Sequence, residues 1–227
     1  MLTGAGISAE SGVPTFRDAM TGLWANFRPE ELATPEAFRR NPEMVWRWYR
    51  ERRLRLGEVA PNPGHYALAQ LARRVPRFTL ITQNVDGLHA RAGSREVIEL
   101  HGNIATVSCF DHRHAAAEFC DTDAVPTCAI CGSLLRPDVV WFGEMLPEEA
   151  LEGARQAAES CDLFLSVGTS NLVEPAASLP WLAAENGATV LVVNVSMDGQ
   201  RRGPRIHHLE GSSAQVLPEL LRGAWPD

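Results

Sequence analysis

The sequence predicts an α/β protein built on a Rossmann-like, doubly wound parallel sheet. Three short apolar runs, at residues 78–86, 161–170 and 188–196, each end in polar residues or glycine, as buried parallel strands do where their carboxyl ends carry function. Helical segments separate these runs, and a glycine-containing loop opens the chain. Strands that alternate with helices in this way favour a doubly wound sheet with ligands bound at the strand ends.

The predicted helices have recognisable ends. Residues 63–75 begin with Pro and Gly and show helical apolar spacing, and residues 147–161 open with Pro147 and two glutamates, as the first turn of a helix prefers. A third helix, at 176–188, is expected to end at Gly187 in a left-handed cap.

The opening loop contains Gly4, Ala5 and Gly6. A small-residue loop between a strand and a helix lets backbone N–H groups approach a phosphate. The spacing fits a loose form of G-x-G-x-x-G with Ala9 in third place, but no acidic residue clearly follows about 20 positions later. The loop alone is therefore a weak indicator of a dinucleotide site.

Composition bounds the class of protein. A chain of 227 residues, 45% hydrophobic and 22% charged, can form one large domain or one domain with a small inserted module. It holds no run near the roughly 18 apolar residues that cross a bilayer, so we expect a soluble protein with no membrane partner. The net charge of −7 argues against a general nucleic-acid binder. We interpret the arginine-rich residues 47–55 as a solvated helix face rather than a nucleic-acid patch.

The start of the chain shows no signal peptide, because the glycine loop begins almost at once. We therefore expect a cytoplasmic protein. Only Met1 and Leu2 precede Thr3, fewer than the about five residues of a typical strand. We expect the printed sequence to start late or to be trimmed.

Two segments break the alternation of strands and helices. Residues 17–62 are rich in Arg and Trp and predict a helical insertion, while residues 103–137, rich in Cys, His and Asp, predict a small zinc-binding module, here called the metal module. The Rossmann-like part is then assembled from residues 1–16, 63–102 and 138–227. We expect these parts to form a single unit.

Four of the five cysteines lie in the metal module. Cys128 and Cys131 have the two-residue spacing with which two thiolates reach one tetrahedral zinc ion. Cys109 is the upstream partner, and either His112, in a C-x-x-H arm, or Cys120 completes the set; we favour His112. The alternative is a loop with free thiols or a disulfide, which a cytoplasmic protein disfavours.

Polar side chains gather just past the predicted strands. Gln83, Asn84 and Asp86 follow the first long apolar run, where amides and a carboxylate can bind a ribose and a carboxamide. His101 follows the apolar residues 97–100, so its ring can project from a strand end into a cleft. A neutral imidazole can take a proton from a sugar hydroxyl, although a lone histidine is more often structural.

Several motifs follow one another along the chain. They are GAGISAESGVPTFR, TQNVDGLHARAG (82–93), ELHGN (99–103), the cysteines, LLRPDVVWFGE (134–144), VGTS and VNVS. In this order and spacing the chain resembles the sirtuin family, in particular its bacterial NAD-dependent protein-lysine deacylases. The resemblance spans nearly the whole chain. It implies NAD as co-substrate, a structural zinc ion, and acyl-lysine proteins or peptides as partners.

The resemblance also implies a mechanism, with His101 and Asn84 as catalytic residues. The acyl-lysine oxygen attacks the NAD ribose as nicotinamide leaves. His101 then acts as general base on a ribose hydroxyl, which attacks the resulting imidate to give free lysine and O-acyl-ADP-ribose. The implied pyrophosphate site is the opening loop, and the implied nicotinamide site includes Ala9, Asn84 and Asp86. The implied zinc ligands are Cys109, His112, Cys128 and Cys131.

The resemblance places the remaining NAD contacts at both ends of the chain. Phe16 and Arg17 are implied to shield the reactive sugar from water on a loop that orders around NAD. The full implied set comprises Gly4, Ala5, Gly6, Ala9, Phe16, Arg17, Trp24, Gln83, Asn84, Asp86, Gly168, Thr169, Ser170, Asn194, Val195, Ser196 and Ala214.

The resemblance implies two substrate-binding segments. The first comprises Val140, Trp141, Phe142, Gly143 and Glu144. With residues 171–175 it is implied to hold the peptide as an added strand, although residues 139–144 also fit a core strand.

Tyr49 and Arg52 have the Y-x-x-R spacing of family members that remove succinyl or malonyl groups. Residues three apart share a helix face, so both side chains can converge on one carboxylate. Acetyl removal is expected to persist. The alternatives are a plain deacetylase, a mono-ADP-ribosyltransferase, a nicotinamide oxidoreductase and a non-catalytic sensor.

Overall fold

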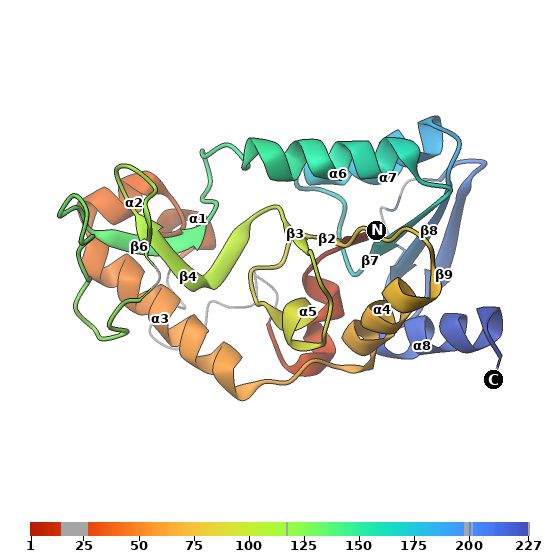
Figure 1. The fold of residues 1–227 in the computed structure, drawn as a ribbon, viewed down its shortest axis with the longest axis horizontal. Helices are drawn as coiled ribbons and strands as arrows, with labels where there is room; N and C mark the ends of the chain where they lie inside the picture. Colours follow the sequence, from red (N-terminus) through yellow and green to blue (C-terminus); the bar gives the residue numbers. More distant parts are fainter. Residues whose placement is uncertain (15–26, 117, 198–199, 201, 227) are drawn as a thin grey trace.

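The computed structural model describes residues 1–14, 27–116, 118–197, 200 and 202–226. Figure 1 shows two lobes, a larger one built around a parallel sheet and a smaller one built from helices and a bent antiparallel sheet. Among the helices formed by these residues, none has the length and apolar character needed to cross a membrane.

A six-stranded parallel sheet forms the larger lobe, in the order β3-β2-β1-β7-β8-β9. Its strands are β1 (Leu2–Thr3), β2 (Ile81–Thr82), β3 (Ile98–Glu99), β7 (Leu163–Val167), β8 (Thr189–Asn194) and β9 (Ile206–Glu210). Successive strands are added to one side of β1 and then to the other, which is the doubly wound order. The predicted Rossmann-like fold class is confirmed.

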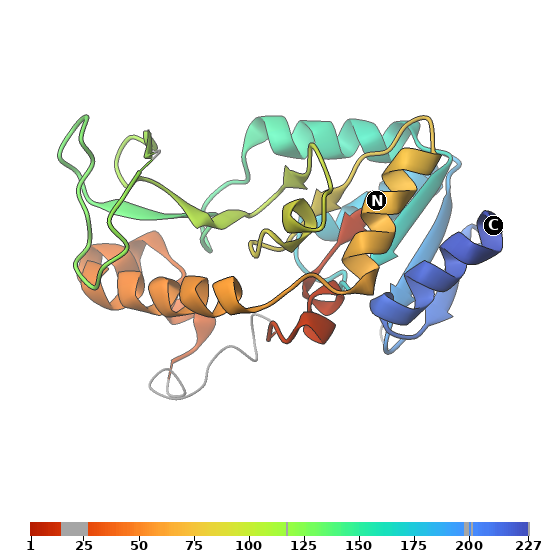
Figure 2. The same ribbon diagram turned by 60° about the horizontal axis from the view of Figure 1, so that its bottom comes forward.

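Helices cover both faces of this sheet. Helices α4 (Pro63–Arg74) and α8 (Ser213–Ala224) lie side by side on one face, and α6 (Glu148–Ser160) and α7 (Leu179–Glu185) lie on the other (Figures 1 and 2). Alternate strand residues supply the two cores, because successive side chains of a strand point to opposite faces. Leu165 packs in the core under α4 and α8, whereas Phe164 packs under α6 and α7.

The smaller lobe joins three helices to a three-stranded antiparallel sheet. The helices are α1 (Pro29–Leu32), α2 (Pro35–Arg40) and α3 (Pro42–Glu58), and the sheet has the order β5 (Ala115–Ala116), β4 (Gly102–Cys109), β6 (Leu135–Val139). The pairing of β4 with β6 shifts register between Asn103 and Val107, which lets β4 bend as it passes from the larger lobe to the smaller one (Figure 1).

Helix α3 is tied to the metal module through its arginines. Arg53 donates to both carboxylate oxygens of Asp121 at 3.0 and 2.7 Å, and its guanidinium lies 5.0 Å from the centre of the Trp46 ring. Arg50 pairs with Asp123 at 3.0 Å. The interpretation of this arginine run as a solvated helix face is therefore wrong for Arg50 and Arg53, because both bind the carboxylates of a neighbouring loop.

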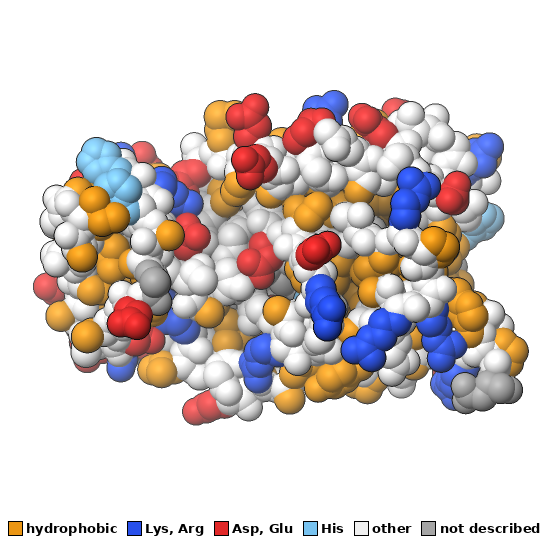
Figure 3. Space-filling model, viewed as in Figure 1, with side chains coloured by type: hydrophobic (Ala, Val, Ile, Leu, Met, Phe, Trp, Pro, Cys, Tyr) orange, Lys and Arg blue, Asp and Glu red, His pale blue; other side chains and the backbone are white. Residues whose placement is uncertain are grey.

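The charged surface is divided between the two helical layers. Acidic side chains gather over α6, where Glu148, Glu152 and Glu159 are exposed, and arginines gather over α4 and α8 (Figure 3). Arg74 and Arg222 are two of these exposed arginines. The separation is not complete, because Arg155 on α6 is exposed as well.

Several elements differ from their predicted lengths. Strand β2 occupies only Ile81–Thr82 of the expected run 78–86, and the expected helix 176–188 is divided into a short 3-10 turn (Ala176–Ser178) and α7. Gly187 has a φ of 97°, so the glycine end predicted for that helix is confirmed. Strand β9 and helix α8 were not anticipated.

Gly102, the first residue of β4, stands where the backbone requires glycine. Its φ is 76°, and an added Cβ would lie 2.1 Å from the Asp138 carbonyl oxygen. We predict that Gly102→Ala lowers the free energy of unfolding by about 2 kcal/mol or more, measured by urea titration. The matched control is Gly57→Ala in α3, where nothing lies within 4 Å of the new methyl group. Equal free energies of unfolding of the two variants would contradict the conclusion that position 102 requires glycine.

Candidate functional site

The site begins where the loops after β1 and β7 meet, at the point where the strand order reverses. The Gly4 N–H donates to the Val167 carbonyl at 3.0 Å, and the Gly6 N–H donates to the Gly168 carbonyl at 2.8 Å. A Cβ on Gly6 would lie 2.7 Å from the Gly168 Cα. The glycines are therefore required for contact between two backbones, and this contact forms the floor of the crevice in which doubly wound sheets bind ligands.

Asn84 and Asp86 lie against this loop, as predicted from their place after β2. The Asn84 amide donates to the Gly4 carbonyl at 3.0 Å and to Ser8 Oγ at 3.2 Å. Ser8 in turn donates to Asp86 Oδ2 at 2.7 Å. Sequence reasoning missed Ser8, although it stands two residues after Gly6 in the same motif.

Two buried histidines lie beneath these polar groups. His65 Nδ1 accepts from the Asn62 N–H at 3.3 Å, so Nε2 carries the proton of the neutral ring and donates to Ser8 Oγ at 3.3 Å. His89 Nε2 lies 2.9 Å from Thr3 Oγ1. Burial lowers the pKa of His65 and, with His65 nearby, lowers the pKa of His89 to about 3. Both rings are therefore neutral at pH 7.

His101 lies at the end of β3, at the entry to β4. Its Nδ1 lies 2.9 Å from the Gln83 carbonyl oxygen, and because a carbonyl only accepts, Nδ1 carries the proton and Nε2 keeps a lone pair. Burial lowers the pKa of His101, and the Gln83 hydrogen bond opposes that shift. The ring is thus neutral near pH 7, and its basic nitrogen is the one not bonded to Gln83.

The second side of the crevice is built around Thr169. The Gln83 amide donates to Thr169 Oγ1 at 3.0 Å, and the Asn194 amide donates to the Thr169 carbonyl at 3.1 Å. Ser170 and Val195 follow β7 and β8 and are exposed. These side chains lie at or just after the carboxyl ends of β2, β7 and β8, as the sequence predicted.

Other predicted NAD contacts lie further out. The Ala214 N–H, in the first turn of α8, donates to Glu10 Oε2 at 3.0 Å. Ala5 is half-buried in the opening loop, while Ala9 and Ser196 are exposed. Phe16, Arg17 and Trp24 lie outside the described residues.

Tyr49 and Arg52 lie one turn apart on α3. Tyr49 is 3% exposed, and its hydroxyl oxygen accepts from Trp141 Nε1 at 3.0 Å. Burial raises the pKa of Tyr49 to about 12, so the phenol keeps its proton. The Arg52 guanidinium lies 4.9 Å from the centre of the Trp48 ring, and burial lowers its pKa.

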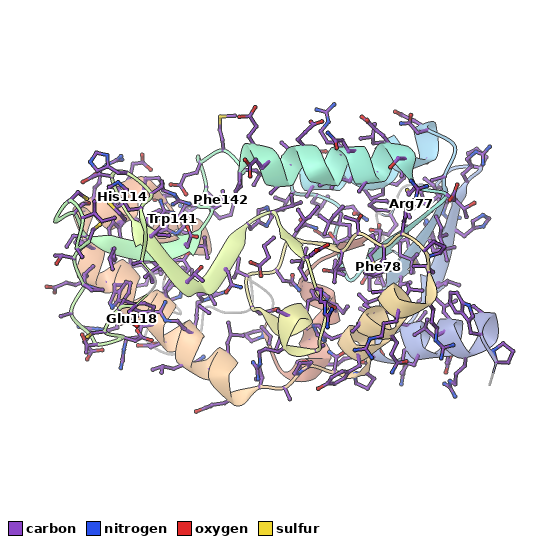
Figure 4. All side chains as sticks on the ribbon, in the orientation of Figure 1. Arg77, Phe78, His114, Glu118, Trp141 and Phe142 are labelled. Carbon is purple, nitrogen blue, oxygen red and sulfur yellow. The ribbon has the colours of Figure 1, made fainter. Side chains whose placement is uncertain are left out.

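Residues 140–144 form a turn after β6 rather than a strand. The Val140 N–H donates to the His101 carbonyl at 2.9 Å, which places the start of this turn beside the imidazole. Gly143 has a φ of 86°. Trp141 is buried whereas Phe142 is 44% exposed, and Figure 4 labels both at the inner side of the smaller lobe.

Glu144 is engaged by the protein itself. Its carboxylate accepts two hydrogen bonds from Arg136, which is 1% exposed, and one from the Trp141 backbone N–H at 2.8 Å. Burial would raise the pKa of Glu144, but these hydrogen bonds outweigh it and hold the pKa below its ordinary value. Glu144 therefore holds the turn in shape.

A cluster of metal-binding side chains lies at the far end of β4. The ligand atoms of Cys109, His114, Cys128 and Cys131 all lie within 4.8 Å of one another. Cys109 Sγ is 3.3 Å from Cys131 Sγ, and His114 Nδ1 is 3.7 Å from Cys128 Sγ. Figure 4 labels His114 at the outer end of the smaller lobe.

The choice of His112 as the fourth member of this cluster needs correction. The cluster contains His114, two residues further on, because the turn that follows Cys109 returns the chain so that the Cys109 N–H donates to the His114 carbonyl at 2.8 Å. His112 instead offers its backbone N–H to the Cys109 sulfur. Cys120 is exposed and outside the cluster as the described residues form it.

The donor set fits a structural zinc ion. Three thiolates and one imidazole match the Cys₃His sets that bind zinc tetrahedrally, with sulfur atoms about 3.8 Å apart for a Zn–S bond of about 2.3 Å. The Cys109 and Cys131 sulfur atoms are 3.3 Å apart, and His114 Nδ1 is 3.7 Å from the Cys128 sulfur, so the four ligand atoms are near enough to share one ion. Four protein ligands leave no open position for a reacting molecule.

Comparison with known proteins agrees with this geometry. The profile of the Sir2 family matches residues 4–175. The chain belongs to the Sir2 family. This Sir2 chain is 52% identical to "NAD-dependent protein deacylase 1" of Pseudomonas aeruginosa, over all of its own length and 94% of the relative.

Solved structures of Sir2 homologues have the same fold. A Sir2 homologue in complex with NAD aligns with a TM-score of 0.87 and 44% identity, covering 98% of this chain and 87% of that one. A Sir2 protein bound to a p53 peptide and NAD+ aligns with a TM-score of 0.81 and 32% identity, covering 98% of this chain and 91% of that one. The similarity therefore extends across both lobes.

Proposed function

We propose that this Sir2-family protein removes acyl groups from lysine side chains of proteins with consumption of NAD. The observation that carries the proposal is the neutral His101, whose Nδ1 is hydrogen-bonded to the Gln83 carbonyl at 2.9 Å and whose Nε2 is therefore basic. It stands at the same sheet edge as Asn84 and Asp86. The names of similar proteins, NAD-dependent protein deacylases, support the same reaction.

The proposed NAD site follows the crevice between the two glycine loops. The loop at Gly4 to Gly6 would lie along the pyrophosphate, and Thr169 and Asn194 would lie beside the adenosine ribose. Asn84 and Asp86 would hold the nicotinamide end, because Ser8 and His65 fix the orientation of both side chains. Groups held in advance need little reorganisation when the glycosidic bond breaks.

The proposed reaction has two stages. The acyl oxygen of lysine attacks the ribose carbon as nicotinamide leaves. His101 then takes the proton of a ribose hydroxyl, whose oxygen attacks the acyl carbon. Expulsion of the lysine amine leaves the acyl carbon bridging two ribose oxygens, and one water molecule opens this ring. The products are the free lysine, nicotinamide and O-acyl-ADP-ribose.

The peptide is proposed to lie between the 140–144 turn and residues 171–175. Phe142, Leu172 and Val173 are 44%, 67% and 43% exposed and offer apolar contacts on these two segments. Main-chain pairing with an extended peptide tolerates many sequences, so selectivity is left to the acyl pocket.

We predict that His101→Asn reduces kcat by about 10²- to 10⁴-fold, because the general base is lost. The neutral ring is the active form. The kcat/KM of the native protein is therefore at its maximum above the pKa of His101 and falls as the pH drops through that pKa. Burial puts that pKa below the ordinary 6.5, so the midpoint of the decline lies below pH 6.5. Because His101 acts after nicotinamide has left, formation of the deacylated peptide measured against pH tests this. The exposed His207→Asn on β9 is the control, and a similar loss in both variants would count against a specific role.

We propose that the acyl pocket accepts succinyl and malonyl groups as well as acetyl. The Arg52 guanidinium and the protonated Tyr49 hydroxyl come from one face of α3, and together they can bind an acyl carboxylate.

Mass spectrometry of matched acetyl-lysine and succinyl-lysine peptides, with and without NAD, tests both activities. We predict that Arg52→Met reduces succinyl removal by roughly 10- to 100-fold, the loss expected for charge-assisted hydrogen bonds, and retains acetyl removal. Arg55→Met, an exposed arginine on the same helix, is the matched control. Acetyl loss alone in the native protein indicates a plain deacetylase, whereas NAD-dependent ADP-ribosylation of a protein acceptor indicates the transferase. No acyl loss with NAD intact overturns the enzyme assignment.

We propose that zinc is bound by Cys109, His114, Cys128 and Cys131 and stabilises the smaller lobe. We predict that His114→Ala loses zinc and unfolds at lower temperature, because a structural site depends on all four ligands. His112→Ala should keep about one zinc per chain. Metal content by mass spectrometry and thermal unfolding test this. Loss of zinc only from the His112 variant would show that His112, and not His114, is the fourth ligand.

A further inference from the structure

The hydrogen bond between Trp141 and Tyr49 joins two distant segments of the chain. Trp141 Nε1 donates to the Tyr49 hydroxyl oxygen at 3.0 Å. An indole N–H can only donate, so the Tyr49 oxygen is the acceptor and its own proton is not used in this contact. Within the part of the chain that the structure describes, no group accepts that proton.

The Trp141 ring is held firmly enough to fix this contact. The Arg136 guanidinium lies 3.4 Å from the ring centre, and Phe38 packs against the ring with centroids 5.4 Å apart. The Trp141 backbone N–H is held by Glu144 at 2.8 Å. With the ring 2% exposed, the indole N–H has one available direction, toward Tyr49.

This contact leaves the phenol with one orientation. A phenolic O–H prefers the plane of its ring, which gives it two directions, one on each side of the C–O bond. The incoming N–H of Trp141 occupies a lone pair on one side. The Tyr49 proton is therefore directed to the other side of the C–O bond. The Arg52 charge lies near enough to this phenol to favour its ionised form.

We propose that Trp141 is a positioning residue for acyl selectivity, which directs the Tyr49 hydroxyl proton toward the carboxylate of an acidic acyl group paired with Arg52. This inference rests on the proposed succinyl and malonyl pocket. An acetyl group has no carboxylate to accept the proton, so Trp141 should affect the acidic acyl groups more than acetyl.

The test replaces the indole N–H and retains an aromatic ring. Trp141→Phe should raise KM for a succinyl-lysine peptide by roughly three- to tenfold, the effect of one misdirected hydrogen bond, with kcat little changed. The ratio of succinyl to acetyl kcat/KM should fall by the same factor. A loosened core would instead lower both activities together and reduce the unfolding temperature.

A double-mutant cycle shows whether Trp141 acts through Tyr49. In a Tyr49→Phe background the hydroxyl is absent, so Trp141→Phe should cause no further loss of succinyl selectivity. Additive losses would overturn the inference, because Trp141 would then act independently of the phenol. If Trp141→Phe fails to fold, benzothienylalanine at position 141 keeps the bicyclic shape with sulfur in place of the N–H, and the same outcomes apply.

The Arg52→Met variant, assayed in the same series, separates this inference from the function on which it rests. Unchanged selectivity in Trp141→Phe, with succinyl removal lost in Arg52→Met, overturns the role of Trp141 and keeps the acyl pocket. Succinyl removal that survives in Arg52→Met overturns both. Loss in Arg52→Met together with a lowered, non-additive selectivity ratio in Trp141→Phe supports both.

Discussion

The contact between the loops after β1 and β7 is the constraint on which the site depends. Adjacent parallel strands place their carboxyl ends about 4.8 Å apart, so two loops that leave these ends in different directions must first pass each other. Gly6 and Gly168 allow this because side chains at either position would collide with backbone. The loop that carries Ser8 is thereby fixed against the sheet, and Asn84 and Asp86 can be held from it.

A second layer of buried polar groups makes this loop rigid. Thr3, His65 and His89 are almost fully buried, and buried hydroxyls and imidazoles are costly unless they are hydrogen-bonded. The hydrogen bonds from Asn62 through His65 to Ser8 satisfy both ring nitrogens of His65. Thr3 Oγ1 lies 2.9 Å from His89 Nε2, whereas His89 Nδ1 has no hydrogen-bond partner among the described residues. Neutral histidines suit this place, because a charged ring would have to be desolvated.

The fold class and the position of the polar residues after β2 could be predicted from the sequence, because strand ends and glycine loops are local patterns. The sequence was insufficient where the outcome depends on how a turn closes. His112 and His114 both follow Cys109 closely, and only the backbone path after Cys109 decides which ring reaches the cluster. A buried arginine engages Glu144, and that pairing is invisible in spacing. Helix α8 was missed, although Val216, Leu217 and the residues that follow have helical apolar spacing.

Helix α3 serves two parts of the molecule at once. Trp46, Arg50 and Arg53 donate hydrogen bonds to the metal module, whereas Tyr49 and Arg52 are the residues of the proposed acyl pocket. Because the helix is one rigid body, a shift that repacks either side moves the other. For protein engineering, a library aimed at new acyl groups should vary positions around the pocket and keep the arginine anchors fixed. Exchanging the metal module with that of a relative should likewise carry α3 along, so that the two faces stay matched.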